Sequence, residues 1–286
     1  MPESLWLALQ RGVVLFGNLP ATLRLVMAGG QVRRLIRRRP ELVLNIATKP
    51  FITSRWNAKE RIAALIDHCH TVARMGSPMD FPDTGFVEVL QLDRIEGSYR
   101  LVLEQSRWLQ MEGLLTFGLY EGTDRFFHLS FCLSSRSGET IAYIGGIQGV
   151  PKPDGLDQHR LFTKRTCAMR PRDFLVETFK LFCCSLGVRK ILAVPDSEHA
   201  NSFTTKGRLP PTYDRLWIER GGELGEDGFF ILPPKLKRRA DGDIPKRKQS
   251  LYRRRYELLE LISHDISRGL LTQSGAGKNV ETCVSP

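Results

Sequence analysis

The stretch from Thr140 to His199 decides the fold: T-I-A-Y-I-G-G-I-Q-G-V (140–150), L-F-T-K-R-T-C-A-M-R-P-R-D (161–173), F-L-V-E-T-F-K-L-F-C-C-S-L (174–186) and V-R-K-I-L-A-V-P-D-S-E-H (188–199). The first run is rich in β-branched and aromatic residues and ends in glycines, which predicts a strand. The basic run predicts a loop. The third run has apolar residues at helical spacing, which predicts a helix with Asp173 as its N-cap and Gly187 as its stop. The last run predicts a short buried strand that leads into a polar turn.

Two strands joined through a helix are expected to pair in parallel, because a crossover of this kind returns the chain in the same direction. The loop before the helix and the end of the second strand then lie at one edge of the sheet, where open α/β sheets bind ligands. Arg170 and Arg172 beside the helix N-terminus therefore predict an anion site for the phosphate of a cofactor. The alternative is that these arginines only complete surface ion pairs.

The composition is that of a soluble globular protein with an excess of positive charge. Of the 286 residues, 42% are hydrophobic and 26% are charged, and the net charge is +11. This charge predicts attraction to nucleic acid, to a phosphorylated cofactor or carrier, or to an anionic membrane surface. The six cysteines include no C-x-x-C pair and no Cys/His ligand spacing, so we expect no metal site and a reducing, cytoplasmic location.

Residues 1–80 predict a helical extension. Their first apolar run is interrupted by Arg11 and Pro20 and does not reach the roughly 20 residues that cross a bilayer, so we expect no signal peptide and no transmembrane helix. Five arginines between positions 33 and 39 then suit a helix on an anionic membrane, at the periphery of the inner membrane. The alternative is a helix packed on its own domain with its arginines in solvent. An amphipathic helix with Asn57 as its N-cap follows.

From Gly85 the hydrophobic pattern changes to near alternation, in runs separated by turn residues. This predicts an antiparallel meander that feeds the β-α-β unit. The whole is an α+β fold: a mixed, mainly antiparallel sheet with flanking helices. We expect a core domain over 81–236, a basic C-terminal helix over 237–268 and a flexible tail over 269–286.

This order of elements resembles the N-acyltransferase (GNAT) fold. The resemblance implies an acyl thioester held between two splayed strands, with its phosphates at the N-terminus of the following helix. The glycine-rich signature expected there is absent, because residues 150–172 intervene before the helix. The likeness is therefore one of topology and not of motif.

Six ordered strings of the chain are similar to the VirK/YbjX family of Gram-negative bacteria: I-G-G-I-Q-G, T-K-R-T-C-A-M-R-P-R-D-F-L, L-G-V-R-K-I-L-A-V-P-D-S-E-H, Y-D-R-L-W-I-E-R-G-G, F-F-I-L-P and I-P-K-R-K-Q-S-L-Y-R-R-R-Y. The similarity runs from about Lys49 to Ser267. The family has no defined activity, and its members are associated with virulence and with resistance to antimicrobial peptides. Where the family has a small residue such as asparagine in the turn after A-V, this chain has Pro195 and Asp196.

The C-terminal region carries nine Lys or Arg residues between Lys237 and Arg255, interleaved with tyrosines. Basic residues interleaved with aromatic ones suit a nucleic-acid backbone, and Arg253, Arg254 and Arg255 are the predicted polyanion-binding residues. The alternative is a solvated amphipathic helix whose leucines pack on the domain.

Two hypotheses for function follow. The first is an acyl- or aminoacyl-transferase whose donor is an acyl-CoA, an acyl-carrier protein or an aminoacyl-tRNA, with no tightly bound cofactor and an amine or related nucleophile as acceptor. The second is a non-enzymatic accessory protein that binds anionic lipid or nucleic acid through its basic ends. For the transferase we predict that Gln148 orients the acyl carbonyl or the acceptor, and that His199 and Tyr213 move protons. Lys164, Arg170 and Arg172 are the predicted phosphate-binding residues.

Overall fold

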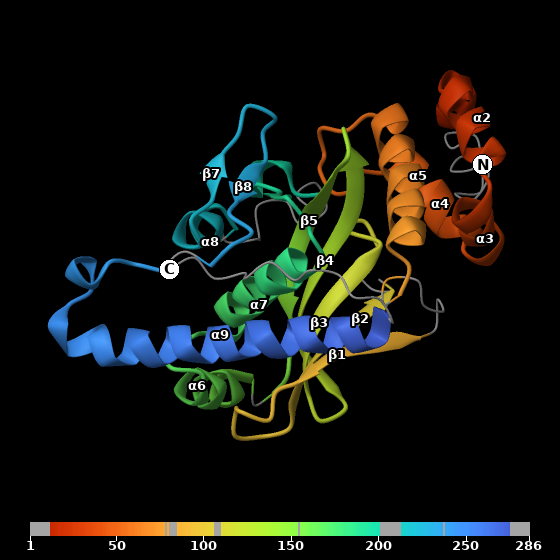
Figure 1. Ribbon diagram of the computed structural model, residues 1–286. Helices are drawn as coiled ribbons and strands as arrows, with labels where there is room; N and C mark the ends of the chain where they lie inside the picture. Colours follow the sequence, from red (N-terminus) through yellow and green to blue (C-terminus); the bar gives the residue numbers. More distant parts are fainter. Residues whose placement is uncertain are drawn as a thin grey trace.

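One mixed sheet of eight strands forms the centre of the protein, and Figure 1 shows the computed structural model. The structure describes residues 12–77, 79, 85–105, 110–153, 155–200, 213–236 and 238–274. The strands are β1 (Phe86–Gln91), β2 (Tyr99–Gln105), β3 (Leu115–Glu121), β4 (Asp124–Arg136), β5 (Glu139–Gly149), β6 (Lys190–Ala193), β7 (Glu223–Leu224) and β8 (Phe230–Leu232).

The spatial order of the strands is β1-β2-β3-β4-β5-β6-β8-β7. Strands β1 to β5 form an antiparallel meander, β5 pairs with β6 in parallel, and β6, β8 and β7 continue in antiparallel pairs. The expected α+β class and the mainly antiparallel mixed sheet are therefore confirmed. The parallel pair has the predicted cause, since the chain returns through a helical connection.

Helices lie on both faces of this sheet. They are α2 (Leu19–Met27), α3 (Gly30–Arg38), α4 (Pro40–Thr48), α5 (Ala58–Met75), α6 (Gly155–Arg165), α7 (Pro171–Ser185), α8 (Tyr213–Glu219) and α9 (Lys246–Ser274), with short 3₁₀ turns η1 (Asp196–Glu198) and η2 (Asp241–Asp243). Figure 1 shows α9 running across the front of α7, while α2 to α5 gather at the margin of the molecule away from α8. The predicted N-cap of α5 is confirmed: Asn57 and Glu60 form a capping box.

The alternation of side chains along the strands divides the core into two layers. On one face, Phe117 and Phe131 pack against the aromatic side of α7, with the rings of Phe117 and Phe182 stacked at 5.0 Å. On the other face, Cys132 and Tyr143 pack with the buried residues of α4 and α5. The central strands are thus buried on both sides, and functional groups on them reach solvent only where a helix leaves the sheet uncovered.

The basic segment before α7 is not the loop that its composition suggests. Residues 155–165 form α6, because Phe162 is fully buried and packs edge-on against Tyr99 at 5.0 Å. Helix α7 also begins two residues before the predicted N-cap, with Pro171 at its first position and Arg170 as the N-cap residue. Asp173 therefore lies in the first turn, where its charge still favours the helix dipole.

Helix α9 is docked onto the connection between α6 and α7. The guanidinium of Arg255 donates to the carbonyl oxygens of Cys167, at 3.0 and 3.2 Å, and of Ala168, at 3.2 Å. Cys167 and Ala168 have φ values of 51° and 60°, a left-handed conformation that non-glycine residues adopt only when the surroundings hold them there. The hydrogen bonds from Arg255 satisfy the carbonyl groups that this turn leaves outside the helices.

Candidate functional site

The parallel ladder between β5 and β6 is short, and β5 continues beyond it. Pairing runs from Ile141 with Lys190 to Ile144 with Ala193, and the N–H of Val194 then donates to the Ile144 carbonyl at 3.0 Å. Strand β5 extends to Gly149. Its last five residues therefore have an edge that β6 does not cover.

Tyr213, the first residue of α8, bridges this uncovered edge. Its hydroxyl donates to the carbonyl oxygen of Ile147 at 3.0 Å and accepts from the N–H of Ile147 at 3.1 Å. Burial raises the pKa of Tyr213 well above its usual value, and the neighbouring charge of Glu112 raises it further. The phenol is therefore protonated at neutral pH, as its donation to the Ile147 carbonyl oxygen requires.

The turn after β6 holds Tyr213 in this place. The Asp196 carboxylate accepts from the N–H of Tyr213 at 3.0 Å and from the N–H of Asp214 at 3.2 Å, and the Asp214 carboxylate accepts from the N–H of Asp196 at 2.8 Å. This reciprocal arrangement satisfies N–H groups in the first turn of α8. Pro195 and Asp196, the departure from the pattern expected of the family, thus make the turn that fixes α8 against the sheet.

Glu112 lies at the centre of the site, and no sequence motif predicted it. It is fully buried, and its Oε1 accepts from Nε2 of Gln148 at 2.9 Å. Nε2 of His199 lies 3.3 Å from the same oxygen, at ion-pairing distance but without the alignment of a hydrogen bond. The His199 ring also packs against the Tyr213 ring, with centroids 5.2 Å apart. Glu112 therefore joins Gln148 on β5 to His199 after η1.

Two glycines on β5 make room for Glu112. A Cβ atom on Gly146 would collide with the Glu112 carboxylate, and one on Gly145 would collide with the Glu112 backbone carbonyl. Glycine inside a strand commonly marks such a close approach of another chain segment. The strand predicted over 140–150 therefore continues through Gly145 and Gly146, and these two glycines accommodate an acidic side chain.

The segment before α5 ties the two halves of the site together. Ile52 has a φ of 62°, which is strained for a β-branched residue, and its N–H donates to the Met111 carbonyl at 2.7 Å. The adjacent Thr53 forms an isolated antiparallel bridge with His199. Ile52 and Thr53 therefore connect the segment that carries Glu112 to the segment that carries His199.

A strip of buried polar side chains continues the site across the sheet. Ser130 lies opposite Gly146, and His128 lies opposite Gln148. Burial lowers the pKa of His128 to about 4, and the charge of Arg125 adds to this effect. Within the described part of the chain, neither ring nitrogen of His128 nor the Ser130 hydroxyl has a hydrogen-bond partner. Alternation along β4 is the sequence signal that could have placed these two residues on one face.

The other predicted site residues lie at increasing distance from this centre. The charge of Arg172 in the first turn of α7 acts on the pKa of Tyr213, so Arg172 borders the site. Arg170 is exposed, and its charge acts on Glu219 at the end of α8. Lys164 is exposed in the last turn of α6. The structure thus gathers Gln148, His199 and Tyr213 around Glu112, with Arg172 at the border of the site.

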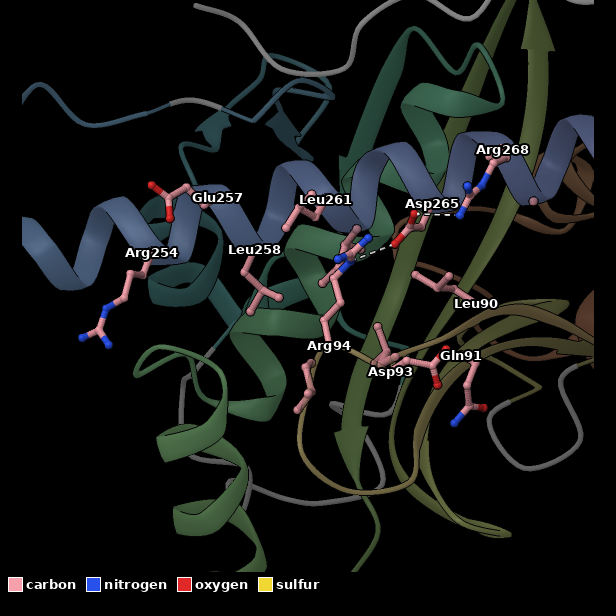
Figure 2. A pocket seen from close by; sticks show the side chains of 14 residues that line it. Leu90, Gln91, Asp93, Arg94, Arg254, Glu257, Leu258, Leu261, Asp265 and Arg268 are labelled. Atoms are coloured by element: carbon pink, nitrogen blue, oxygen red, sulfur yellow. Dashed lines mark hydrogen bonds and ion pairs between the residues drawn. The ribbon is translucent and has the colours of Figure 1, made fainter.

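The three C-terminal arginines differ in role. Arg255 is a structural residue, because it docks α9 onto the α6–α7 connection. Arg253 and Arg254 are exposed. Arg254 lines a groove of about 940 Å³ between α9 and the β1–β2 connection, which Figure 2 shows from close by. The Asp265 carboxylate pairs there with Arg94 at 3.1 Å, so the groove carries both signs of charge and is not uniformly basic.

The fold and the site define an α+β protein with a buried pair, Glu112 and His199, at a strand edge that β6 does not cover. The chain belongs to the DUF535 family, described as proteins of unknown function, which it matches over residues 10–268. It is 25% identical to the uncharacterized protein YbjX of Escherichia coli K12 over 80% of this chain and 72% of that protein. It is 26% identical to an uncharacterized protein of Haemophilus influenzae Rd over 77% of this chain and 73% of that protein.

The similarity to YbjX confirms the family predicted from the sequence strings. No solved structure matches the chain, so the likeness to N-acyltransferases has no structural relative behind it. In the described ranges, no helix combines the length and the apolar character needed to cross a membrane.

Proposed function

We propose that the protein transfers an acyl or aminoacyl group from a phosphate-bearing donor to an amine, at the uncovered edge of β5. The observation that carries this proposal is the buried Glu112, which contacts both Gln148 and His199 beside the strand edge that Tyr213 bridges. The GNAT-like topology belongs to the same proposal.

The uncovered edge supports the binding of an extended donor arm. Because backbone groups alternate along a strand, the N–H and C=O of Gly149 lie along the same edge as those of Ile147. An extended ligand can pair with such an edge as an added strand does. Helix α7 is 15 residues long, and Arg170 and Arg172 lie at its N-terminus. The helix dipole and these two positive charges favour binding of the donor's phosphates at this end.

The buried pair supports proton transfer. The acceptor amine attacks the acyl carbonyl, so that a C–N bond forms and the thioester C–S bond, or the ester C–O bond of an aminoacyl-tRNA, breaks. His199 accepts the proton of the amine and returns it to the leaving sulfur or oxygen. The Glu112 carboxylate stabilises the imidazolium that forms between these two steps. Gln148 holds the carboxylate in position, and Tyr213 is a positioning residue because its hydroxyl is engaged with Ile147.

The burial of the pair sets a requirement on this mechanism. The side chain of His199 is 2% exposed, so the site has to open for the acceptor to reach the imidazole. The polar strip of His128 and Ser130 supports an incoming polar substrate, because buried polar groups without partners are costly and a ligand can satisfy them.

The test is a turnover assay with three donors in parallel: an acyl-CoA, an acyl-carrier protein and an aminoacyl-tRNA, each with a mixture of primary amines. We expect one donor to be consumed by the wild type and consumption to fall at least about a hundredfold in His199→Ala and Glu112→Gln. His264→Ala is the matched control, because His264 is exposed on α9. Equal rates for wild type and His199→Ala with all three donors, in folded proteins, would reject the proposal.

A further inference from the structure

The N-terminal helices carry an unusual concentration of exposed apolar side chains. Of the twelve large hydrophobic residues that are exposed in the described part of the chain, six lie between positions 13 and 27. They are Val13, Phe16, Leu19, Leu23, Val26 and Met27. Phe16 and Met27 are each 78% exposed. Scattered exposed apolar residues need no explanation, but a contiguous set marks a surface that binds something.

Helix α2 is apolar on both sides. Ala21 and Leu25 are buried, and the helix packs on α5 through this side. Leu19, Leu23 and Val26 follow the spacing i, i+4, i+7, which places them along the opposite side. Among the described residues, this outer apolar stripe belongs to neither layer of the core, and the described fold does not account for it.

Helix α3 supplies a basic surface beside this stripe. Val32 is its buried residue, and the helix also packs on α5. Four arginines, Arg33, Arg34, Arg37 and Arg38, are exposed on its other side. Because α2 and α3 pack on the same helix, both turn these second sides outward, and Figure 1 shows them together at the margin of the molecule away from α8. No Asp or Glu occurs between positions 4 and 40 of the sequence.

We propose that the outer side of α2 and α3 is a peripheral binding surface for an anionic lipid bilayer. The apolar stripe of α2 enters the boundary between headgroups and acyl chains, and the α3 arginines contact the lipid phosphates. The combination decides the partner. A nucleic acid would use the arginines and leave the apolar stripe in water, whereas a bilayer uses both. Since no described helix has the length and apolar character to cross a bilayer, the binding is peripheral. This surface is separate from the proposed transferase site.

The experiment is co-sedimentation of the full chain with vesicles of phosphatidylglycerol and phosphatidylcholine in equal parts, and with phosphatidylcholine alone. A first variant, Leu23→Gln with Val26→Gln and Met27→Gln, removes the apolar stripe and leaves the charge unchanged. A second variant changes Arg33, Arg34, Arg37 and Arg38 to Gln. The matched control changes four exposed basic residues of α9, Lys246, Arg247, Lys248 and Arg268, to Gln. Circular dichroism and thermal unfolding establish that each variant is folded.

We expect wild type and control to bind the anionic vesicles and both α2 and α3 variants to bind them about a hundredfold more weakly. Binding to the neutral vesicles should be weak throughout. Titration with a single-stranded RNA oligonucleotide distinguishes the other polyanion. The proposal is overturned if the α2 variant sediments like wild type, if the α9 control loses as much binding as the α3 variant, or if RNA binds more tightly than the anionic vesicles.

Discussion

The hydroxyl of Tyr213 is hydrogen-bonded to both the carbonyl oxygen and the N–H of Ile147, at 3.0 and 3.1 Å, so a single side chain takes the place of a strand at the edge of β5. The Asp196 carboxylate, which accepts from the N–H of Tyr213, keeps that side chain in register. Tyr213 is thereby held against the ring of His199, which lies with Gln148 at Glu112, so these three predicted site residues are close together.

Replacing Tyr213 by Phe should destabilise the fold by about 1–3 kcal/mol, because the buried backbone groups of Ile147 lose their partner. The free energy of unfolding in urea measures this. Tyr256→Phe is the control, since the Tyr256 hydroxyl accepts from the N–H of Arg239 in an exposed position. Equal losses in the two variants would show that the Ile147 contact has no particular weight.

Replacing Gly146 by Ala should destabilise the protein by about 1–3 kcal/mol, although alanine is usually the better residue inside a strand. The added methyl group would collide with the Glu112 carboxylate. Gly242→Ala should be close to neutral, because open space surrounds that position. In the Glu112→Ala background the cost of Gly146→Ala should shrink, and a cost that stays the same in both backgrounds would contradict the packing described here.

Arg255 and its neighbour Arg254 should respond differently to the same change. Arg255→Gln is expected to lower the free energy of unfolding by about 1–3 kcal/mol, because the carbonyl groups of Cys167 and Ala168 lose charge-assisted hydrogen bonds. Arg254→Gln should change it by less than about 0.5 kcal/mol, since Arg254 is exposed. Similar values from denaturant titrations of the two variants would place Arg255 in solvent.

Stability should fall as the pH is lowered from about 6.5 to 4. Burial lowers the pKa values of His68 and His128 to about 4, from an ordinary value of 6.5. In this range the unfolded chain binds protons that the folded chain does not, so each histidine removes about 1.4 kcal/mol of unfolding free energy per pH unit, and the stabilisation is fully present above pH 6.5.

Two variants distinguish the contribution of His68 to the pH dependence of stability from that of other titrating groups. His68→Asn keeps an acceptor for the N–H of Leu133, which Nδ1 of His68 accepts at 3.0 Å, but it does not titrate. It should flatten the pH dependence between pH 6.5 and 4, and His264→Asn on the surface should not. Parallel pH profiles for His68→Asn and wild type would mean that His68 titrates normally.

The sequence predicted what local patterns control. Alternation predicted the meander, Asn57 predicted the start of α5, and the crossover predicted the parallel pair of β5 and β6. Helix α6 was missed because its charged surface outweighs a single buried anchor, Phe162, whose partners Tyr99 and Phe126 are distant in the sequence. A helix with a single buried apolar residue has no repeating apolar pattern, so its sequence does not predict it.

The site was predicted in part for a similar reason. Gln148, His199 and Tyr213 lie near ends of elements, where topology alone brings residues to one edge of the sheet. Glu112 lies in a connection, and its position depends on the strained Ile52 and on the space at Gly145 and Gly146. The glycine pair inside a strand was the available signal, because it indicates that another segment approaches closely.

The most direct measurement of the transferase account is native mass spectrometry of the full chain purified from its own host. We expect a retained donor that carries phosphate, an acyl-CoA, an acyl-carrier protein or an aminoacyl-tRNA. It should remain bound to His199→Ala and be reduced at least about tenfold in the variant Arg170→Ala with Arg172→Ala, because each charge-assisted contact to phosphate contributes about 1.5–3 kcal/mol. The double variant Arg160→Ala with Arg268→Ala removes two exposed arginines elsewhere and should keep the donor. A wild-type protein that retains none of the three donors, or one that loses its donor equally in both double variants, would contradict the account.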